Sequence, residues 1–251
     1  GFFLFVISLS AQKRFQSQFF LSSDSILNVQ ANLDLFTPPQ SDTLQLRPLI
    51  IYISGQDAHY INYFKLFAND FSKKGYIVAN LKYDINSSNS KNFKLVVKKI
   101  GNNLITAVHF LKRNAKIYGI DTSQIFLTGS QVGSTVAMSV VYNLNNTAAP
   151  TNQIFNGVIN IGGALMDTSF IKEGSSPLFN VSSIHYTDSL FNSNLKVNGF
   201  KFDGYELYKK SVESGNSTGW LSLNRTGYTQ KIMNQNYEKC RVAICLNANN
   251  G

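Results

Sequence analysis

The chain has 251 residues, of which 43% are hydrophobic and 13% aromatic. This composition is enough to build one α/β domain with a large core. The formal net charge is +9, but the Lys and Arg residues are scattered and form no recognisable nucleic-acid motif. A solvated basic surface is therefore favoured, and we expect no nucleic-acid partner.

The N-terminal stretch, Gly1 to Ala11, combines an apolar run with small residues and resembles the end of a secretory signal peptide. The run is too short to cross a bilayer, and a buried N-terminal strand is the alternative. Cys240 and Cys245 could pair in an exported protein or remain two thiols, and their spacing does not suit zinc. We expect a secreted, periplasmic or extracellular protein with no membrane span, metal or cofactor.

The rest of the chain, from residue 28 to residue 245, alternates predicted strands with predicted helices. Asn28 to Phe36 is expected to form an edge strand because it ends at Thr-Pro-Pro. Phe93 to Tyr118 has apolar residues at three- and four-residue steps, which predicts one long helix that is disturbed at Gly101 and ended by Gly119. The other predicted strands are Leu46 to Ile53, Tyr76 to Leu81, Ile125 to Thr128, Ile154 to Ile161, Leu178 to Ile184 and Gly219 to Leu223. The other predicted helices are Tyr60 to Lys74, Val132 to Leu144, Tyr205 to Ser214 and Thr229 to Tyr237.

This alternation predicts the fold class. Strands that alternate with helices indicate an α/β domain with a mostly parallel sheet and helices on both faces. The connection after Gly163 is short, so we expect no large lid. We find no internal repeat and no interdomain linker, and we predict a single domain.

The stretch from Ile125 to Ser139 carries the main functional signal. A short apolar strand leads into a turn bracketed by Gly129 and Gly133, and an apolar helix follows. This is the pattern of a nucleophile elbow, a sharp strand-to-helix turn that raises one side chain above the sheet. Small residues are needed two positions before and after the apex because strand and helix nearly touch there. The apex is Gln131, whose amide cannot be deprotonated into a nucleophile at ordinary pH.

The segment from Arg47 to Leu144 resembles the α/β-hydrolase superfamily, in its carboxylesterase and lipase-like branch. The strand that begins at Arg47 and runs into Ser-Gly-Gln is similar to the one that ends in the family's His-Gly-Gly oxyanion motif. The strand after Gly75 and the approach to the elbow from Ala115 also match in order and spacing, and a weaker similarity continues to about Cys240. The resemblance implies an α/β-hydrolase-type domain without fixing an activity.

The resemblance also implies where a catalytic triad would lie. Gln131 holds the nucleophile position, and Asp188 holds the acid position in a segment similar to His-Gly-x-x-Asp. The base position is Tyr228, where relatives have a His after the last strand; a Tyr, with a pKa near 10, is a weak base at neutral pH. None of the three His residues follows the last strand. The alternative for Asp188 is that it only caps a turn.

The oxyanion loop is altered as well. Relatives have His-Gly-Gly-Gly where this chain has Ser-Gly-Gln-Asp, and the charge of Asp57 would oppose a developing oxyanion. Glycine is retained only at Gly55, and Gln56 restricts the backbone freedom that a glycine would allow. The expected pocket and oxyanion-loop residues are Ser54, Gly55, Gln56, Asp57, Ser130 and Val132.

The nucleophile, the base and the oxyanion loop of the family are all altered in this chain, and each change argues against ester hydrolysis. We expect a catalytically inactive α/β-hydrolase-fold protein, whose former pocket is either filled in or able to bind a small polar ligand. The alternative is an active carboxylesterase that uses a relocated nucleophile, such as Ser130 or Ser134 with Asp188. That alternative has a large enzyme family behind it, but it needs a base that the sequence does not offer.

Overall fold

The computed structural model describes residues 14–21, 30–38, 45–55, 58–83, 93–142, 154–183 and 199–223. The leader-like segment Gly1 to Ala11, the predicted helix Thr229 to Tyr237 and the two cysteines lie outside these residues. Within the described part, no helix is both long and apolar enough to span a membrane.

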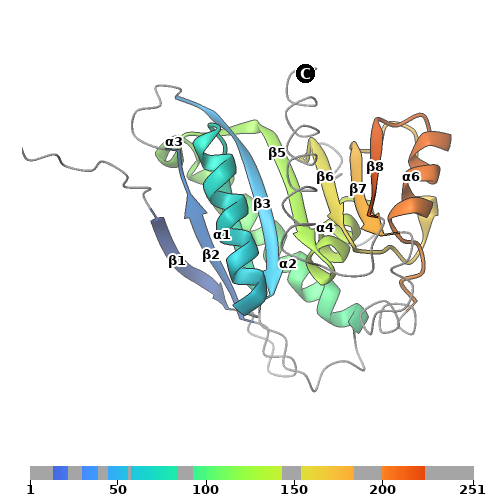
Figure 1. Ribbon diagram of the computed structural model, residues 1–251. Helices are drawn as coiled ribbons and strands as arrows, with labels where there is room; N and C mark the ends of the chain where they lie inside the picture. The colour runs from blue at the N-terminus through green and yellow to red at the C-terminus, as the bar shows by residue number, and fades with distance from the viewer. Residues whose placement is uncertain are drawn as a thin grey trace, which may run out of the picture.

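The described strands form one eight-stranded sheet in the order β1-β2-β4-β3-β5-β6-β7-β8 (Figure 1). The pairs from β4 to β8 along this order are parallel, and β2 pairs antiparallel with both β1 and β4. The strands are β1 (Arg14–Leu21), β2 (Gln30–Phe36), β3 (Arg47–Gly55), β4 (Ile77–Tyr83), β5 (Ile120–Ser130), β6 (Gly157–Ile161), β7 (Leu178–Ser183) and β8 (Thr218–Leu223). The mostly parallel sheet that the sequence predicted is confirmed.

Helices cover both faces of the sheet, also as predicted (Figure 1). α1 (Ala58–Lys73) packs on one face through Phe64, Phe67 and Phe71, which join the ring of Tyr52 in one buried aromatic cluster. α2 (Phe93–Arg113), α4 (Val132–Tyr142) and α6 (Gly204–Glu213) contribute to the larger core on the other face. The short elements are α3 (Ala115–Tyr118) and the 3-10 turn η3 (Thr168–Phe170).

The position of β2 corrects one prediction. β2 is not an edge strand, because β1 pairs with it along its outer side, from Arg14 opposite Phe36 to Leu21 opposite Gln30. Pro38 follows the end of β2 but does not make β2 an edge strand, since the strand that covers β2 comes from earlier in the chain.

The structure also corrects the prediction of one long helix that is disturbed at Gly101. α2 runs through Gly101 without interruption, and a Cβ at this position would meet the Val140 side chain of α4 at 3.0 Å, so Gly101 allows two helices to approach. The helix breaks at Asn114 instead, where the side-chain Nδ2 donates to the carbonyl of Phe110 at 2.8 Å. Gly119 then ends α3 in the left-handed conformation, with a φ of 71°, as expected.

Candidate active site

The turn between β5 and α4 has the strained geometry of an elbow. Gln131 has a φ of 51° and is the only non-glycine residue with a positive φ in the described part of the chain. Its N–H donates to the Ile161 carbonyl at 2.8 Å, and its own carbonyl accepts the N–H of Thr135 at 2.9 Å. A left-handed conformation costs a residue with a Cβ about 1–2 kcal/mol. The hydrogen bonds to the neighbouring strand and helix therefore hold Gln131 in a conformation that is unfavourable for an isolated residue.

Glycines on both sides of Gln131 make this turn possible. A Cβ on Gly133 would lie 2.1 Å from the carbonyl oxygen of Ile53 in β3. A Cβ on Gly129 would lie 2.9 Å from the same oxygen and 2.7 Å from the carbonyl carbon of Gly133. The structure thus places the two glycines where strand and helix come closest, against the central strand β3.

A third glycine, which sequence reasoning did not single out for this role, completes the packing. A Cβ on Gly163 would lie 2.6 Å from the Cβ of Ser134 and 2.7 Å from the backbone nitrogen of Thr135. Gly163 follows β6, whose last residue pairs with Ser130. Its only signal in the sequence is the Gly-Gly step after a predicted strand.

The two serines that flank Gln131 differ in what their hydroxyls do. Ser134 is fully buried, its Oγ donates to the Gly129 carbonyl at 2.5 Å, and the same Oγ accepts the Ile161 N–H at 2.9 Å. That hydroxyl ties β5, β6 and α4 together. Ser130 is half-buried at the end of β5, and the Tyr52 hydroxyl lies 3.4 Å from its Oγ.

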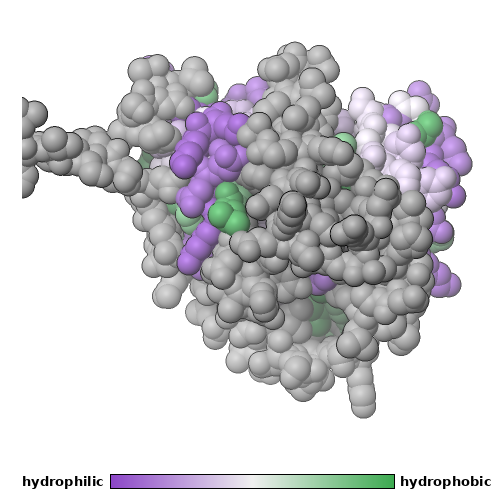
Figure 2. Space-filling model, in the orientation of Figure 1, coloured by the Kyte–Doolittle hydropathy of each residue, from purple (hydrophilic) through white to green (hydrophobic). Residues whose placement is uncertain are grey.

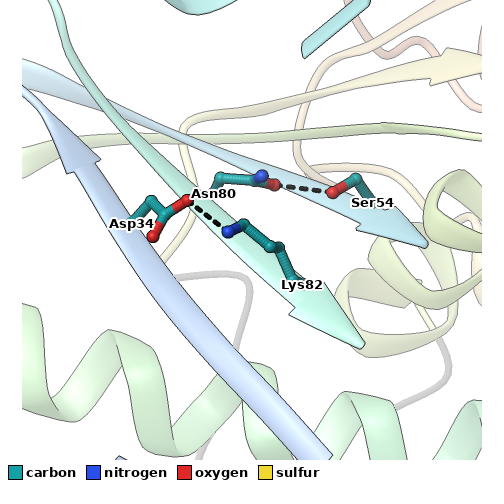
Figure 3. Close-up of polar contacts among 4 residues, drawn as sticks. All are labelled: Asp34, Ser54, Asn80 and Lys82. Carbon is teal, nitrogen blue, oxygen red and sulfur yellow. Dashed lines mark hydrogen bonds and ion pairs between the residues drawn. The ribbon is translucent and has the colours of Figure 1, made fainter. Parts of the chain in front are cut away.

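The start of the predicted oxyanion loop is bound to the sheet. Ser54 is buried and donates from Oγ to Oδ1 of Asn80 at 2.9 Å, as Figure 3 shows. Beside it, Lys82 of β4 pairs with Asp34 of β2 at 2.5 Å. Gly55 ends β3, and Gln56 and Asp57 lie outside the described residues. The Ser54 hydroxyl is therefore engaged with β4, and the structure does not place the Asp57 charge.

Asp188 and Tyr228 also lie outside the described residues, so the convergence of Gln131, Asp188 and Tyr228 stays a prediction. It does place the ends of the preceding strands. β5, β7 and β8 belong to the parallel part of the sheet, so the chain leaves β7 and β8 at the same carboxyl edge at which Gln131 lies. In open α/β sheets this edge is where ligands bind.

The described residues supply no evident base or metal site. His109 is the only histidine whose side chain is described, and it is exposed on α2, away from the elbow. No group of three or more potential metal ligands occurs in the described part of the chain. Val132 begins α4, which leaves its N–H without an acceptor inside the helix.

Two buried asparagines fix the turn after β6 and were not predicted as site residues. Asn160 accepts the Gly163 N–H at 2.8 Å, and its Nδ2 donates to Oδ1 of Asn180 at 3.0 Å. Both side chains are fully buried, and they lie side by side in the register of β6 and β7. The available signal was an amide in an otherwise apolar strand, because a buried amide needs a hydrogen-bond partner.

Several solved structures that share this fold are esterases. The chain is similar to the native structure of the thermophilic esterase Est2 of the Planctomycetes species Thermogutta terrifontis, with a TM-score of 0.66 and 12% identity over 94% of this chain and 92% of that one. It is also similar to a fungal esterase from Rhizomucor miehei, with a TM-score of 0.62 and 11% identity over 94% of this chain and 86% of that one. The Thermogutta esterase has also been solved with butyrate bound, with propionate bound and phosphorylated by paraoxon. At this identity the likeness establishes the fold alone.

Sequence comparison adds the family. No curated protein sequence matches the chain. Residues 33–183, more than half of the chain, match the BD-FAE family, and this segment includes β3, the elbow and β7. The chain belongs to the BD-FAE family, an α/β-hydrolase-type esterase family.

Proposed function

We propose that this chain is a catalytically inactive member of its family that binds a small polar ligand at the elbow. The observation that carries the proposal is Gln131, an amide at the strained apex of the turn. An amide nitrogen cannot serve as the nucleophile of acyl transfer, which requires a hydroxyl, thiol or carboxylate that a base can activate. Ser134 does not replace it, since its hydroxyl is buried and already bonded on both sides.

The proposed ligand is a small carboxylic acid or its ester. The first N–H groups of α4 lack acceptors within the helix, and such a helix start favours a carboxylate or carbonyl oxygen. Butyrate and propionate bind to the Thermogutta esterase, which has the same fold. In this chain the glycines that position α4 against β3 are retained, which supports a site that keeps its backbone donors without its nucleophile.

Thermal unfolding in the presence of short carboxylates and esters tests the binding. A ligand at a hundred times its Kd should stabilise the native state by about 2.7 kcal/mol. The shift should be reduced in Gln131→Trp, which places a bulky ring at the apex of the turn, and should persist in the remote control His109→Ala. No stabilisation by any short acid or ester would refute the ligand class.

Hydrolysis of short-chain p-nitrophenyl esters tests the loss of catalysis. We expect the wild type to be silent and the double reversion Gln131→Ser with Tyr228→His to gain activity. Paraoxon, which phosphorylates the Thermogutta esterase, should label the double reversion and leave the wild type at its unmodified mass. Wild-type turnover that paraoxon blocks would overturn the proposal.

An active esterase with a relocated nucleophile is the second candidate. One observation favours it: Ser130 lies half-buried one residue before the apex, with the Tyr52 hydroxyl 3.4 Å from its Oγ. Paraoxon adduct at Ser130, with activity lost in Ser130→Ala and retained in Ser134→Ala, would establish this alternative. An unlabelled wild type rejects it.

We also propose that the protein is exported. The proposal rests on the leader-like run from Gly1 to Ala11 and on the pair Cys240 and Cys245. N-terminal sequencing of the mature protein should find a start just after this run, and thiol titration of the purified protein should find no free thiol. A mature chain that retains Gly1 to Ala11 would contradict export by cleavage.

A further inference from the structure

The basic residues that are scattered along the sequence are concentrated on one helix of the structure. α2 contains five Lys and Arg residues and no Asp or Glu, so it carries more than half of the net charge of +9. The other three long helices differ from it. α1 has Asp70 in addition to two lysines, α6 has two Glu for its two Lys, and α4 has no charged residue. The excess of positive charge therefore belongs to α2.

Most of these cations lie on the outward face of α2. α1 and α2 cover opposite faces of the sheet (Figure 1), and α2 packs on it through buried residues such as Val96, Ile100 and Leu104. The exposed polar residues of α2 recur at steps of three or four and so form one stripe. They are Lys94, Lys98, Asn102, Thr106, His109 and Arg113, and the half-buried Lys112 lies beside them. The four cations Lys94, Lys98, Lys112 and Arg113 form no ion pair within the described part of the chain.

Exposed apolar side chains accompany the cations at both ends of this stripe. Leu95 is 41% exposed near the start of α2, and Ile117, on α3, is 77% exposed beyond its end. Leu46 is 59% exposed at the same end as Ile117, because the N–H of Arg47 donates to the carbonyl of Gly119 at 2.9 Å. A helix of 21 residues is about 30 Å long. The stripe therefore presents cations over about 30 Å, with apolar side chains near each end.

We infer that this stripe docks on a membrane surface of anionic phospholipids. The docking surface, which we call the α2 basic face, consists of Lys94, Leu95, Lys98, Lys112 and Arg113. Anionic headgroups attract Lys and Arg side chains that lie within a Debye length of the surface. The apolar side chains enter the boundary between headgroups and acyl chains, while the long basic side chains keep their charges among the headgroups.

The exposed apolar residues favour a lipid surface over a nucleic acid. Sites for single-stranded nucleic acid combine cations with aromatic side chains on which the bases stack. The exposed residues of α2 include no aromatic side chain. Leu95 and Ile117 gain free energy when they leave water, and a lipid boundary offers them an apolar environment that a hydrated polyanion does not. Charge and apolar exposure together therefore fit a lipid surface.

Co-sedimentation of the full chain with lipid vesicles tests the inference. We expect binding to phosphatidylcholine vesicles that contain about one-third phosphatidylserine, little binding to pure phosphatidylcholine, and weaker binding as salt screens the charges. Lys98→Gln with Arg113→Gln should reduce the affinity about tenfold or more, because each cation near an anionic surface strengthens binding several-fold.

The matched control for this charge change lies on the other side of the sheet. Lys65→Gln with Lys73→Gln removes the same charge from exposed positions of α1, where Figure 2 shows a hydrophilic surface. This control should reduce the affinity by about twofold at most, since its charges lie away from the docked surface. Equal weakening by the two double variants would overturn the inference, because net charge alone would then explain the binding.

A second variant tests the apolar contact. Leu95→Gln keeps the net charge, so it should weaken binding to the phosphatidylserine vesicles only if this side chain enters the lipid. Leu66→Gln is its control, because Leu66 is 52% exposed on α1, and it should bind as the wild type does. Vesicle binding that Leu95→Gln leaves unchanged would overturn the inference. So would a wild type that binds duplex DNA through Lys98 and Arg113 but does not bind the vesicles.

Discussion

Gly133→Ala is the sharpest test of how the elbow is built. The new Cβ would lie 2.1 Å from the carbonyl oxygen of Ile53, well inside the 3.0 Å that real Cβ atoms keep. Ile53 is fully buried in β3, and β4 and β5 hold that strand from both sides. The carbonyl cannot move away without disturbing two parallel ladders, so α4 must shift instead.

The expected cost follows from two opposing effects. Overpacking of a core contact costs typically 1–3 kcal/mol and occasionally more, and a clash with central backbone belongs at the upper end. The higher helix propensity of alanine returns about 1 kcal/mol. We expect a net loss of about 2 kcal/mol, which lowers the Tm by roughly 4–8 °C in a domain of this size.

Urea and thermal unfolding followed by circular dichroism would measure this loss. Gly101→Ala is the matched control, because it makes the same change inside a helix but its Cβ meets only the end of the Val140 side chain at 3.0 Å. That control should change stability by less than about 1 kcal/mol, since the valine can turn and the propensity gain remains. If Gly133→Ala proved as stable as Gly101→Ala, the close approach of β3 and α4 would not be the reason for the glycine.

Four further changes have defined outcomes. Gln131→Gly should raise the free energy of unfolding by about 1 kcal/mol in urea melts, because glycine adopts the left-handed conformation without the cost to a Cβ. Ser134→Ala should lower the free energy of unfolding by about 1–3 kcal/mol, because it leaves the buried Ile161 N–H and the buried Gly129 carbonyl without this partner. In any variant that has esterase activity, the same substitution should leave that activity unchanged. Asp34→Asn should cost about 2–3 kcal/mol by leaving Lys82, whose side chain is only 20% exposed, without its ion pair; adding Lys82→Met should recover part of this loss. Burial raises the pKa of Tyr142 in the folded protein, so the unfolded chain loses this proton at a lower pH than the folded chain does. The stabilisation from the protonated Tyr142 is therefore full below about pH 10 and decreases as the pH rises further. Tyr142→Phe should reduce this decrease in urea melts at alkaline pH.

Local features of this chain were readable from the sequence. The strand before Gly129, the helix after it and the left-handed stop at Gly119 each follow from patterns within a few residues. The close approach of strand and helix at the elbow could be anticipated because two glycines at fixed spacing leave few other interpretations. The physical cause of each of these features lies in the local residues themselves, so each can be predicted without knowing the rest of the fold.

Features that depend on strand order were not readable. Ser54 bonds to Asn80, and Lys82 pairs with Asp34, because β4 lies between β3 and β2 in the sheet although it follows both in the chain. The edge position expected for β2 failed for the same reason, since no local pattern revealed that Arg14–Leu21 would cover it. Gly101 was misread because a glycine inside a helix weakens it in isolation, whereas here it admits the neighbouring helix α4.

The left-handed conformation of Gln131 can be explained by packing, without reference to catalysis. In an active hydrolase a strained apex aims a nucleophile, so strain and chemistry are easily taken as one selected feature. In this chain an amide stands at the apex and the left-handed φ persists, held by the Ile161 carbonyl on one side and the Thr135 N–H on the other. Gly129 and Gly133 lie so close to Ile53 that a Cβ on either would clash with its carbonyl oxygen. The packing of strand, helix and β3 is therefore sufficient to impose the strain. It follows that a left-handed apex, taken alone, identifies the fold and says nothing of catalysis, which must be argued from the side chain that the apex presents.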